Sequence, residues 1–190
     1  MSEQKFDPGP LAEVAYEQEG DRHTLVFTRF LAHPPEKVWE ALTEPEQMKH
    51  WAPYVPDGSL GVTGERTFRM IDGSTDEPMA ATVARAERPR LLEYSFQDGR
   101  LVWELTAHND GTLLTLRHTV PNADWVTKIA AGWHLCLVVA ERLLEGNPIP
   151  PIVGAAAVEF GWERLNDAYA QQMGLESSGF PEDRFPDSKL

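Results

Sequence analysis

The chain has 190 residues, of which 42% are hydrophobic and 25% are charged, the composition of a folded protein that needs no disulfide framework. It carries 30 acidic and 17 basic residues, for a formal net charge of -13. A field of this sign repels phosphate groups, so we expect neither nucleic acid nor a membrane surface as a partner.

Residues 1–21 are rich in acidic side chains and contain no basic segment followed by an apolar stretch. We therefore expect an acidic N-terminal extension without an export signal. The single cysteine, Cys136, cannot form an internal disulfide, which fits a reducing, cytoplasmic setting. The longest apolar run, residues 129–140, spans 12 residues and is interrupted by His134. A membrane span needs about 20, so this run predicts a buried helix.

Residues 22–31 begin the predicted fold with a strand, since β-branched and aromatic side chains dominate them. Two short helices are expected next, because Pro35 and Pro45 suit first helical turns. They carry Trp39 and end near Trp51, and we interpret both indoles as core side chains.

Turn signals punctuate the chain up to Val120 and predict an antiparallel meander. Asp98-Gly99 and Asp110-Gly111 predict two hairpins that join strands over 91–96, 101–106 and 113–120. Period-two alternation assigns one face of these strands to large apolar side chains and one histidine. That face comprises Leu92, Tyr94, Phe96, Leu101, Trp103, Leu105, Leu114, Leu116 and His118.

A helix over 124–144 follows, with apolar residues at helical spacing and Trp133 near its centre. Because it is apolar almost all round, we expect it to be buried on two sides. A second helix over 155–173 would cover its back. The organisation is then a domain over 22–146, a linker with an additional packed helix over 147–174, and a mobile tail over 175–190.

Four motifs in order point to a known family. They are the segment AHPPEKVWEALTEPE at 32–46, then Trp51, then DGTLLTLRH at 110–118, then Gly132-Trp133-His134-x-x-Leu137. With these the chain resembles the activator of heat-shock protein 90 ATPase homologue-like branch of the SRPBCC superfamily. The resemblance implies an α+β helix-grip (START-like) fold, in which a curved antiparallel sheet wraps around a long helix. It also implies a hydrophobic cavity between them.

The predicted walls of that cavity are the large side chains of the covered face and the long helix: Tyr94, Phe96, Trp103, Leu105, Leu116, His118 and Trp133. His118 is the sharpest polar candidate. It is either a core histidine bonded to a neighbouring element or a ligand contact. His134 lies on the flank of the long helix, seven residues before Glu141, and is predicted to be half-exposed near that carboxylate.

The six histidines form no pair at H-x-x-H or H-x-x-x-H spacing, and the sequence has no Gly-x-Ser-x-Gly and no glycine-rich phosphate loop. We expect no metal and no cofactor.

Three functions stay open. In the first, an apolar or aromatic small molecule is bound in the cavity. In the second, the protein is a cyclase- or aromatase-like enzyme that uses His118, Tyr94 or His134 as acid or base. In the third, it contacts a chaperone or a second copy of itself, as a homodimer. An open cavity with His118 in its wall favours the first two, and a filled interior favours the third.

Overall fold

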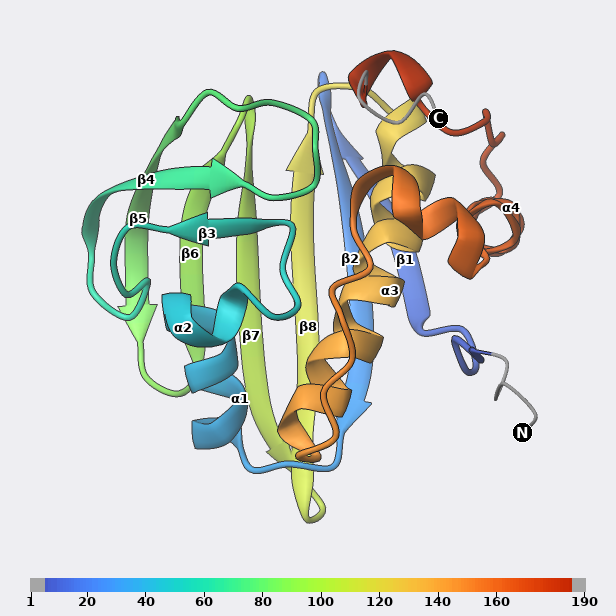
Figure 1. The fold of residues 1–190 in the computed structure, drawn as a ribbon. Helices are drawn as coiled ribbons and strands as arrows, with labels where there is room; N and C mark the ends of the chain where they lie inside the picture. Colours follow the sequence, from blue (N-terminus) through green and yellow to red (C-terminus); the bar gives the residue numbers. More distant parts are fainter. Residues whose placement is uncertain (1–5, 186–190) are drawn as a thin grey trace.

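One antiparallel sheet of eight strands frames the molecule, and the computed structural model describes residues 6–185 (Figure 1). The strand order across the sheet is β1-β2-β8-β7-β6-β5-β4-β3. The strands are β1 (Glu13–Glu19), β2 (Arg22–Leu31), β3 (Tyr54–Pro56), β4 (Gly64–Met70), β5 (Met79–Glu87), β6 (Leu91–Phe96), β7 (Gly99–His108) and β8 (Gly111–Val120). The helices are α1 (Pro35–Thr43), α2 (Pro45–Met48), α3 (Asp124–Leu144) and α4 (Trp162–Met173), with short 3-10 turns η1 (Gly154–Phe160) and η2 (Glu182–Arg184).

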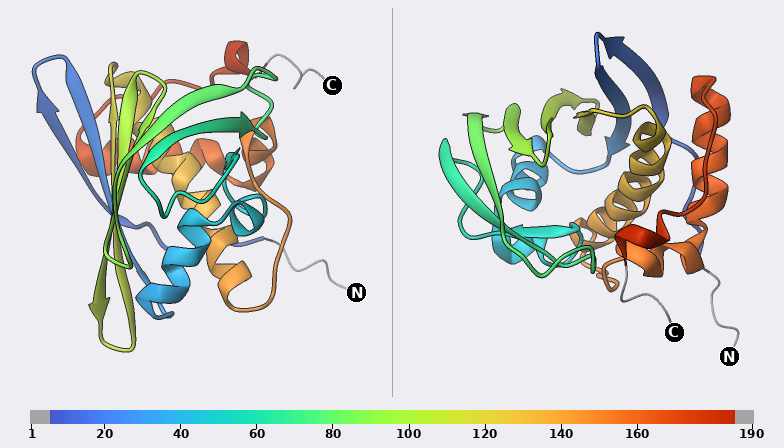
Figure 2. Two further views of the ribbon diagram at one scale, coloured as in Figure 1. Left: turned by 90° about the vertical axis from the view of Figure 1, so that its left-hand side faces the viewer. Right: turned by 90° about the horizontal axis from the view of Figure 1, so that it is seen from above.

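The sheet curls around α3, and α4 lies against the side of α3 that faces away from the sheet (Figure 2). This confirms the helix-grip fold expected from the sequence. Burial on two sides also explains why α3 is apolar almost all round, because its residues face the sheet on one side and α4 on the other.

The hairpin registers place the predicted faces as expected. Leu101 lies opposite both Tyr94 on β6 and His118 on β8, and the large side chains of that face are buried. A glycine is required at the start of β7, because a Cβ on Gly99 would lie 1.8 Å from the main-chain oxygen of Thr119. The start of β7 and the end of β8 therefore approach too closely for any side chain at this position.

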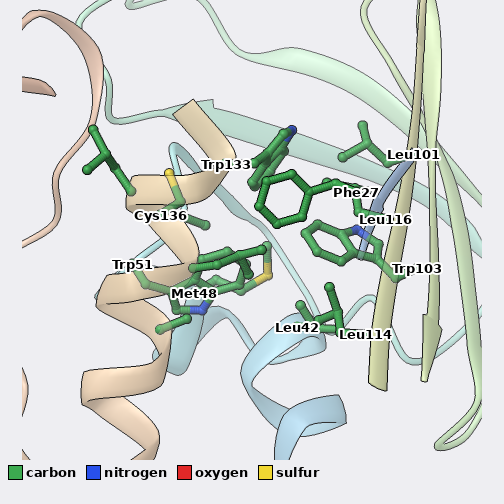
Figure 3. Close-up of a cluster of buried hydrophobic side chains, with 14 of the residues drawn as sticks. Phe27, Leu42, Met48, Trp51, Leu101, Trp103, Leu114, Leu116, Trp133 and Cys136 are labelled. Atoms are coloured by element: carbon green, nitrogen blue, oxygen red, sulfur yellow. The ribbon is translucent and has the colours of Figure 1, made fainter. Parts of the chain in front are cut away.

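An aromatic cluster fills the space between α3, the sheet and the two short helices (Figure 3). Trp39 and Trp51 are each 1% exposed, which confirms them as core residues. Trp51 donates its indole N–H to the carbonyl oxygen of Ala41 at 2.9 Å. Trp103 packs edge-on against Trp51 at 6.4 Å and against Trp133 at 5.2 Å between ring centroids. Such edge-to-face pairs stabilise a core beyond their buried area.

The acidic N-terminal extension contains an element that the sequence analysis did not predict. Residues 13–19 form β1, an edge strand paired antiparallel with β2. Val14 and Tyr16 are half-buried on one face, while the other residues of the strand are exposed. Two half-buried residues are a weak alternating pattern, and the strand forms because β2 supplies its hydrogen bonds.

The predicted helix over 155–173 is in fact two pieces. Gly161 adopts a left-handed conformation, with φ of 92°, and separates the 3-10 turn η1 from α4. Beyond α4, the predicted tail is in contact with the body over residues 175–185: the ring of Phe180 packs edge-on against Trp162, with centroids 5.1 Å apart. The rest of that tail, residues 186–190, lies outside the described residues.

Candidate functional site

A cavity of about 240 Å³ lies between α3, the ends of the central strands and the C-terminal segment. Six residues of α3 line it with the spacing of a single helical face. They are Trp125, Lys128, Ile129, Gly132, Trp133 and Cys136. One face of α3 therefore forms a wall of the cavity.

The sheet side of the cavity is aromatic and apolar. Phe96 ends β6, His118 and Val120 lie near the end of β8, and Tyr54 comes from β3. The rings of Tyr54 and Phe96 are 4.8 Å apart between centroids. Tyr54 on β3 and His118 on β8 both lie next to Trp133 of α3, whose ring is 6.4 Å from Tyr54 and 6.1 Å from His118 between centroids.

Three of the seven residues predicted as cavity walls line this cavity: Phe96, His118 and Trp133. The other four, Tyr94, Trp103, Leu105 and Leu116, are buried deeper in the core and do not line it. Tyr94 is one step removed, because its hydroxyl is 2.5 Å from the hydroxyl of Tyr54. Trp103 in turn donates its indole N–H to the Tyr94 hydroxyl at 3.1 Å. Strand alternation gave the correct face, but position along the strand decides which residue reaches the open volume.

His118 is 5% exposed, and it is both bonded to a neighbouring element and part of the cavity wall. Trp133 donates its indole N–H to Nδ1 of His118 at 3.0 Å, so the imidazole is bonded to a neighbouring element. It also forms part of the cavity wall, next to the edge-on ring of Phe96 at 6.0 Å. Burial lowers the pKa of His118 to about 3, so the ring is neutral at physiological pH.

Gly132 lies at the centre of the α3 face that lines the cavity. Apart from the backbone of its own helix turn, no atom of the described residues would lie within 4 Å of a Cβ built on this glycine. No neighbouring element therefore requires glycine at this position.

The half-exposed position predicted for His134 is wrong. The side chain is fully buried, with Nδ1 2.7 Å from the hydroxyl of Tyr169 and Nε2 2.7 Å from the carbonyl oxygen of Pro8. Glu141 pairs instead with Arg29, at 2.5 Å. The N-terminal segment folds across this part of α3, and nothing local to His134 in the sequence signals that cover.

The C-terminal segment supplies cavity residues that the sequence analysis missed. Phe180, Arg184 and Phe185 line the cavity. The guanidinium of Arg184 lies 4.8 Å from the ring centroid of Trp125, a cation–π contact. Lys128, which is 8% exposed, is hydrogen-bonded to the hydroxyl of Ser178. The aromatic residues within this charged C-terminal sequence were the feature that could have indicated that the segment packs on the domain.

No group of three or more His, Cys, Asp or Glu side chains within residues 6–185 is arranged to hold a metal ion. Over the same residues no helix has the length and apolarity of a membrane span. Cys136 lines the cavity, and burial raises the pKa of its thiol to about 12. The thiol is therefore protonated and unreactive at neutral pH.

The curled antiparallel sheet, the long helix across it and the cavity between them define a protein of the helix-grip, START-like class. Comparison with family models then gives the family. The model for "Activator of Hsp90 ATPase homolog 1-like protein" matches residues 32–145, more than half of the chain, and the chain belongs to this family. A search of curated proteins gave no significant match.

Solved structures share the fold at low sequence identity. A conserved protein of unknown function from Enterococcus faecalis, EF2215, is 18% identical with a TM-score of 0.67, over 84% of this chain and 90% of that one. CalU16 from Micromonospora echinospora is 18% identical with a TM-score of 0.62, over 85% and 96%. An AHSA1-like protein from Aeromonas hydrophila is 21% identical with a TM-score of 0.53, over 65% and 92%.

Proposed function

We propose that this protein binds an apolar, aromatic small molecule in the cavity between α3 and the sheet. The observation that carries the proposal is Gly132. Glycine inside a helix costs about 1 kcal/mol relative to alanine, and here no atom of another element within residues 6–185 lies within 4 Å of a Cβ. The open volume itself explains the glycine, since any larger residue would project into the cavity.

The size and chemistry of the cavity define the class of ligand. At about 240 Å³ it is slightly smaller than pockets for drug-sized molecules, which span roughly 300–1000 Å³. A ligand with one or two fused aromatic rings fits this volume. Aromatic walls from Phe96, Trp133 and Phe180 favour stacked or edge-on contacts with such rings.

Acid–base catalysis in the cavity is a weaker alternative. A general acid or base works best with a pKa near the operating pH. Burial moves the buried groups at or beside the cavity the other way: it raises the pKa of Tyr54 well above its usual value and that of Tyr94 to about 12. It lowers the pKa of His118 to about 3. These neutral groups suit the binding of a neutral ligand better than proton transfer.

The name of the family suggests a chaperone partner as another alternative. An interaction protein of that kind needs no internal cavity, so a filled interior would have supported it. The open volume next to His118 supports ligand binding.

A cavity-filling variant tests the proposal. Gly132→Leu places a side chain in the open volume, whereas Gln171→Leu adds the same side chain at an exposed position of α4 away from the cavity. Naphthalene binding is followed by ligand-detected NMR, and molecules carried through purification are sought by native mass spectrometry. We expect the wild type and Gln171→Leu to bind naphthalene and Gly132→Leu to remain folded without binding it. Absence of binding to the wild type, or equal binding by Gly132→Leu, would contradict the proposal.

A further inference from the structure

We infer that Trp133 fixes the tautomer of His118, so that the cavity presents a hydrogen-bond donor and its ligand carries a matching acceptor, such as a ketone oxygen on the aromatic body. This inference rests on the proposed function and names the chemical class of its ligand. It assigns to Trp133 a positioning role that goes beyond packing.

The tautomer follows from what an indole can do. A Trp side chain has one N–H and no acceptor atom, so Trp133 can only donate. Its Nε1 lies 3.0 Å from Nδ1 of His118, so Nδ1 is the acceptor and carries no proton. A neutral imidazole with a bare Nδ1 carries its proton on Nε2.

The charged form of His118 does not compete with this tautomer. A protonated imidazole has an N–H on both nitrogens, and its Nδ1–H would face the indole N–H of Trp133. Burial opposes the charge as well and holds the pKa of His118 at about 3. The neutral Nε2–H tautomer is therefore the form present at neutral pH.

The Nε2–H group of His118 is the donor that remains for a ligand. Within residues 6–185 no protein atom is hydrogen-bonded to it, and it is not one of the fully buried atoms that lack a partner, so it reaches the open volume of the cavity. The rings of Phe96 and Trp133 flank the imidazole, and neither has a side-chain acceptor. A ligand that fills the cavity displaces water from this N–H, and a donor left without a partner is unfavourable, so a ligand that brings an acceptor to this spot gains over one that does not.

The predicted selectivity is for acceptors. A ligand that brings only a donor would need the opposite tautomer, which would cost the hydrogen bond from Trp133. A ketone oxygen accepts from Nε2–H and leaves that bond intact.

Two-bond proton–nitrogen correlation NMR of the isotope-labelled full chain measures the tautomer without any ligand. We expect a bare Nδ1 and a protonated Nε2 for His118 in the wild type. In Trp133→Phe, which keeps an aromatic ring but removes the donor, we expect the signals to move towards a mixture of tautomers. His134 is an internal control, because Nε2 donates to the carbonyl oxygen of Pro8 in both proteins.

Binding of two matched probes tests the ligand class. Acetylnaphthalene has a carbonyl acceptor, and isopropylnaphthalene has the same shape without one. We expect the wild type to prefer the ketone about three- to tenfold. His118→Phe should bind both equally. His118→Gln should retain the preference, since an amide oxygen can accept from Trp133 while the amide N–H donates to the ketone.

The outcomes separate this inference from the proposed function. A protonated Nδ1 in His118, or equal affinity of the wild type for both probes, overturns the inference and leaves ligand binding in place. Failure of both probes to bind the wild type overturns the proposed function, and the inference about the ligand class is then overturned as well.

Discussion

The imidazole of His134 on α3 and the hydroxyl of Tyr169 on α4 are 2.7 Å apart, at the point where three segments of the chain meet. The main-chain N–H of Ala12 donates to the same hydroxyl at 2.9 Å. The carbonyl oxygen of Pro8 accepts from Nε2 of His134. Because Nε2 donates, Nδ1 accepts the hydroxyl proton of Tyr169, and all these polar atoms are satisfied. This network joins the N-terminal segment to both helices.

Tyr169→Phe should therefore destabilise the protein by about 2–3 kcal/mol, because it leaves the Ala12 N–H and the His134 Nδ1 without a partner in a buried place. Urea unfolding measures the loss. Tyr16→Phe is the matched control: the hydroxyl of this half-buried residue on the edge strand β1 lies 2.6 Å from Nδ1 of His23, but water can replace it as a partner, so its loss should cost less than about 1 kcal/mol. Equal losses in the two variants would show that the network around His134 adds nothing to stability.

His118 should make stability depend on pH. Burial lowers its pKa in the folded protein to about 3 from an ordinary value of 6.5, so between these values the unfolded chain binds a proton that the folded protein does not. The contribution of the neutral His118 to the free energy of unfolding is then fully present above about pH 6.5. It is lost as the pH drops below that value, by up to about 1.4 kcal/mol per pH unit. Urea unfolding between pH 7 and pH 5 checks this. His118→Phe should show a shallower dependence, and an unchanged slope would count against a buried neutral imidazole.

The sheet faces were predictable because strand alternation is a local pattern. Leu114, Leu116 and His118 alternate with polar residues, and each lies on the buried face. The strand β1 was not predictable in this way. Its exposed acidic residues conceal the half-buried Val14 and Tyr16, and its hydrogen bonds come from β2. An edge strand of this kind is determined by its neighbour more than by its own sequence.

The cavity was predictable only in part, because its walls come from segments far apart in the chain. Alternation placed Tyr94 and Phe96 on one face, but only the strand end at Phe96 reaches the open volume. The burial of His134 depends on Pro8, 126 residues away in sequence. The cavity residues Phe180 and Arg184 belong to a charged segment with no periodicity. Tertiary contacts of these kinds leave no local pattern to detect.

The register of β8 gives a direct test of the sheet. Leu114 is fully buried, whereas Thr115 is half-buried on the opposite face, across from Glu104. Leu114→Lys should prevent folding, because it places a charge without a partner in the core. Thr115→Lys should change the free energy of unfolding by less than about 1 kcal/mol, since it gains an opposite charge across the strand pair. Circular dichroism and thermal unfolding distinguish the two results, and similar losses would contradict the register.

Phe180 tests the C-terminal side of the cavity. Its ring packs on Trp162 and stacks with Phe185 at 5.2 Å between centroids. Phe180→Ala should increase amide hydrogen exchange over residues 176–185 and speed release of naphthalene, because the segment loses its main apolar contact. Exchange in β8 should be unchanged. Val62→Ala, at an exposed position, is the control for loss of a surface apolar side chain, and it should alter neither measurement.

Two glycines should respond in opposite ways to the same substitution. At Gly132 a Cβ meets no atom of another element in the described part of the chain within 4 Å, so Gly132→Ala should stabilise the protein by about 0.5–1 kcal/mol through higher helix propensity. At Gly99 a Cβ would lie 1.8 Å from the main-chain oxygen of Thr119. Gly99→Ala should therefore destabilise by about 1–3 kcal/mol or more, since two backbones in a hairpin must separate.

Urea unfolding of both variants, together with naphthalene binding, distinguishes the two effects. Gly132→Ala should gain stability while binding large probes less well, because its methyl group occupies part of the cavity. Gained stability with weaker binding is the result expected where glycine leaves room for a ligand. Lost stability is the result expected where glycine allows two backbones to approach closely. A loss of stability in Gly132→Ala would mean that the helix needs glycine there for packing, and the main support for the ligand cavity would be removed.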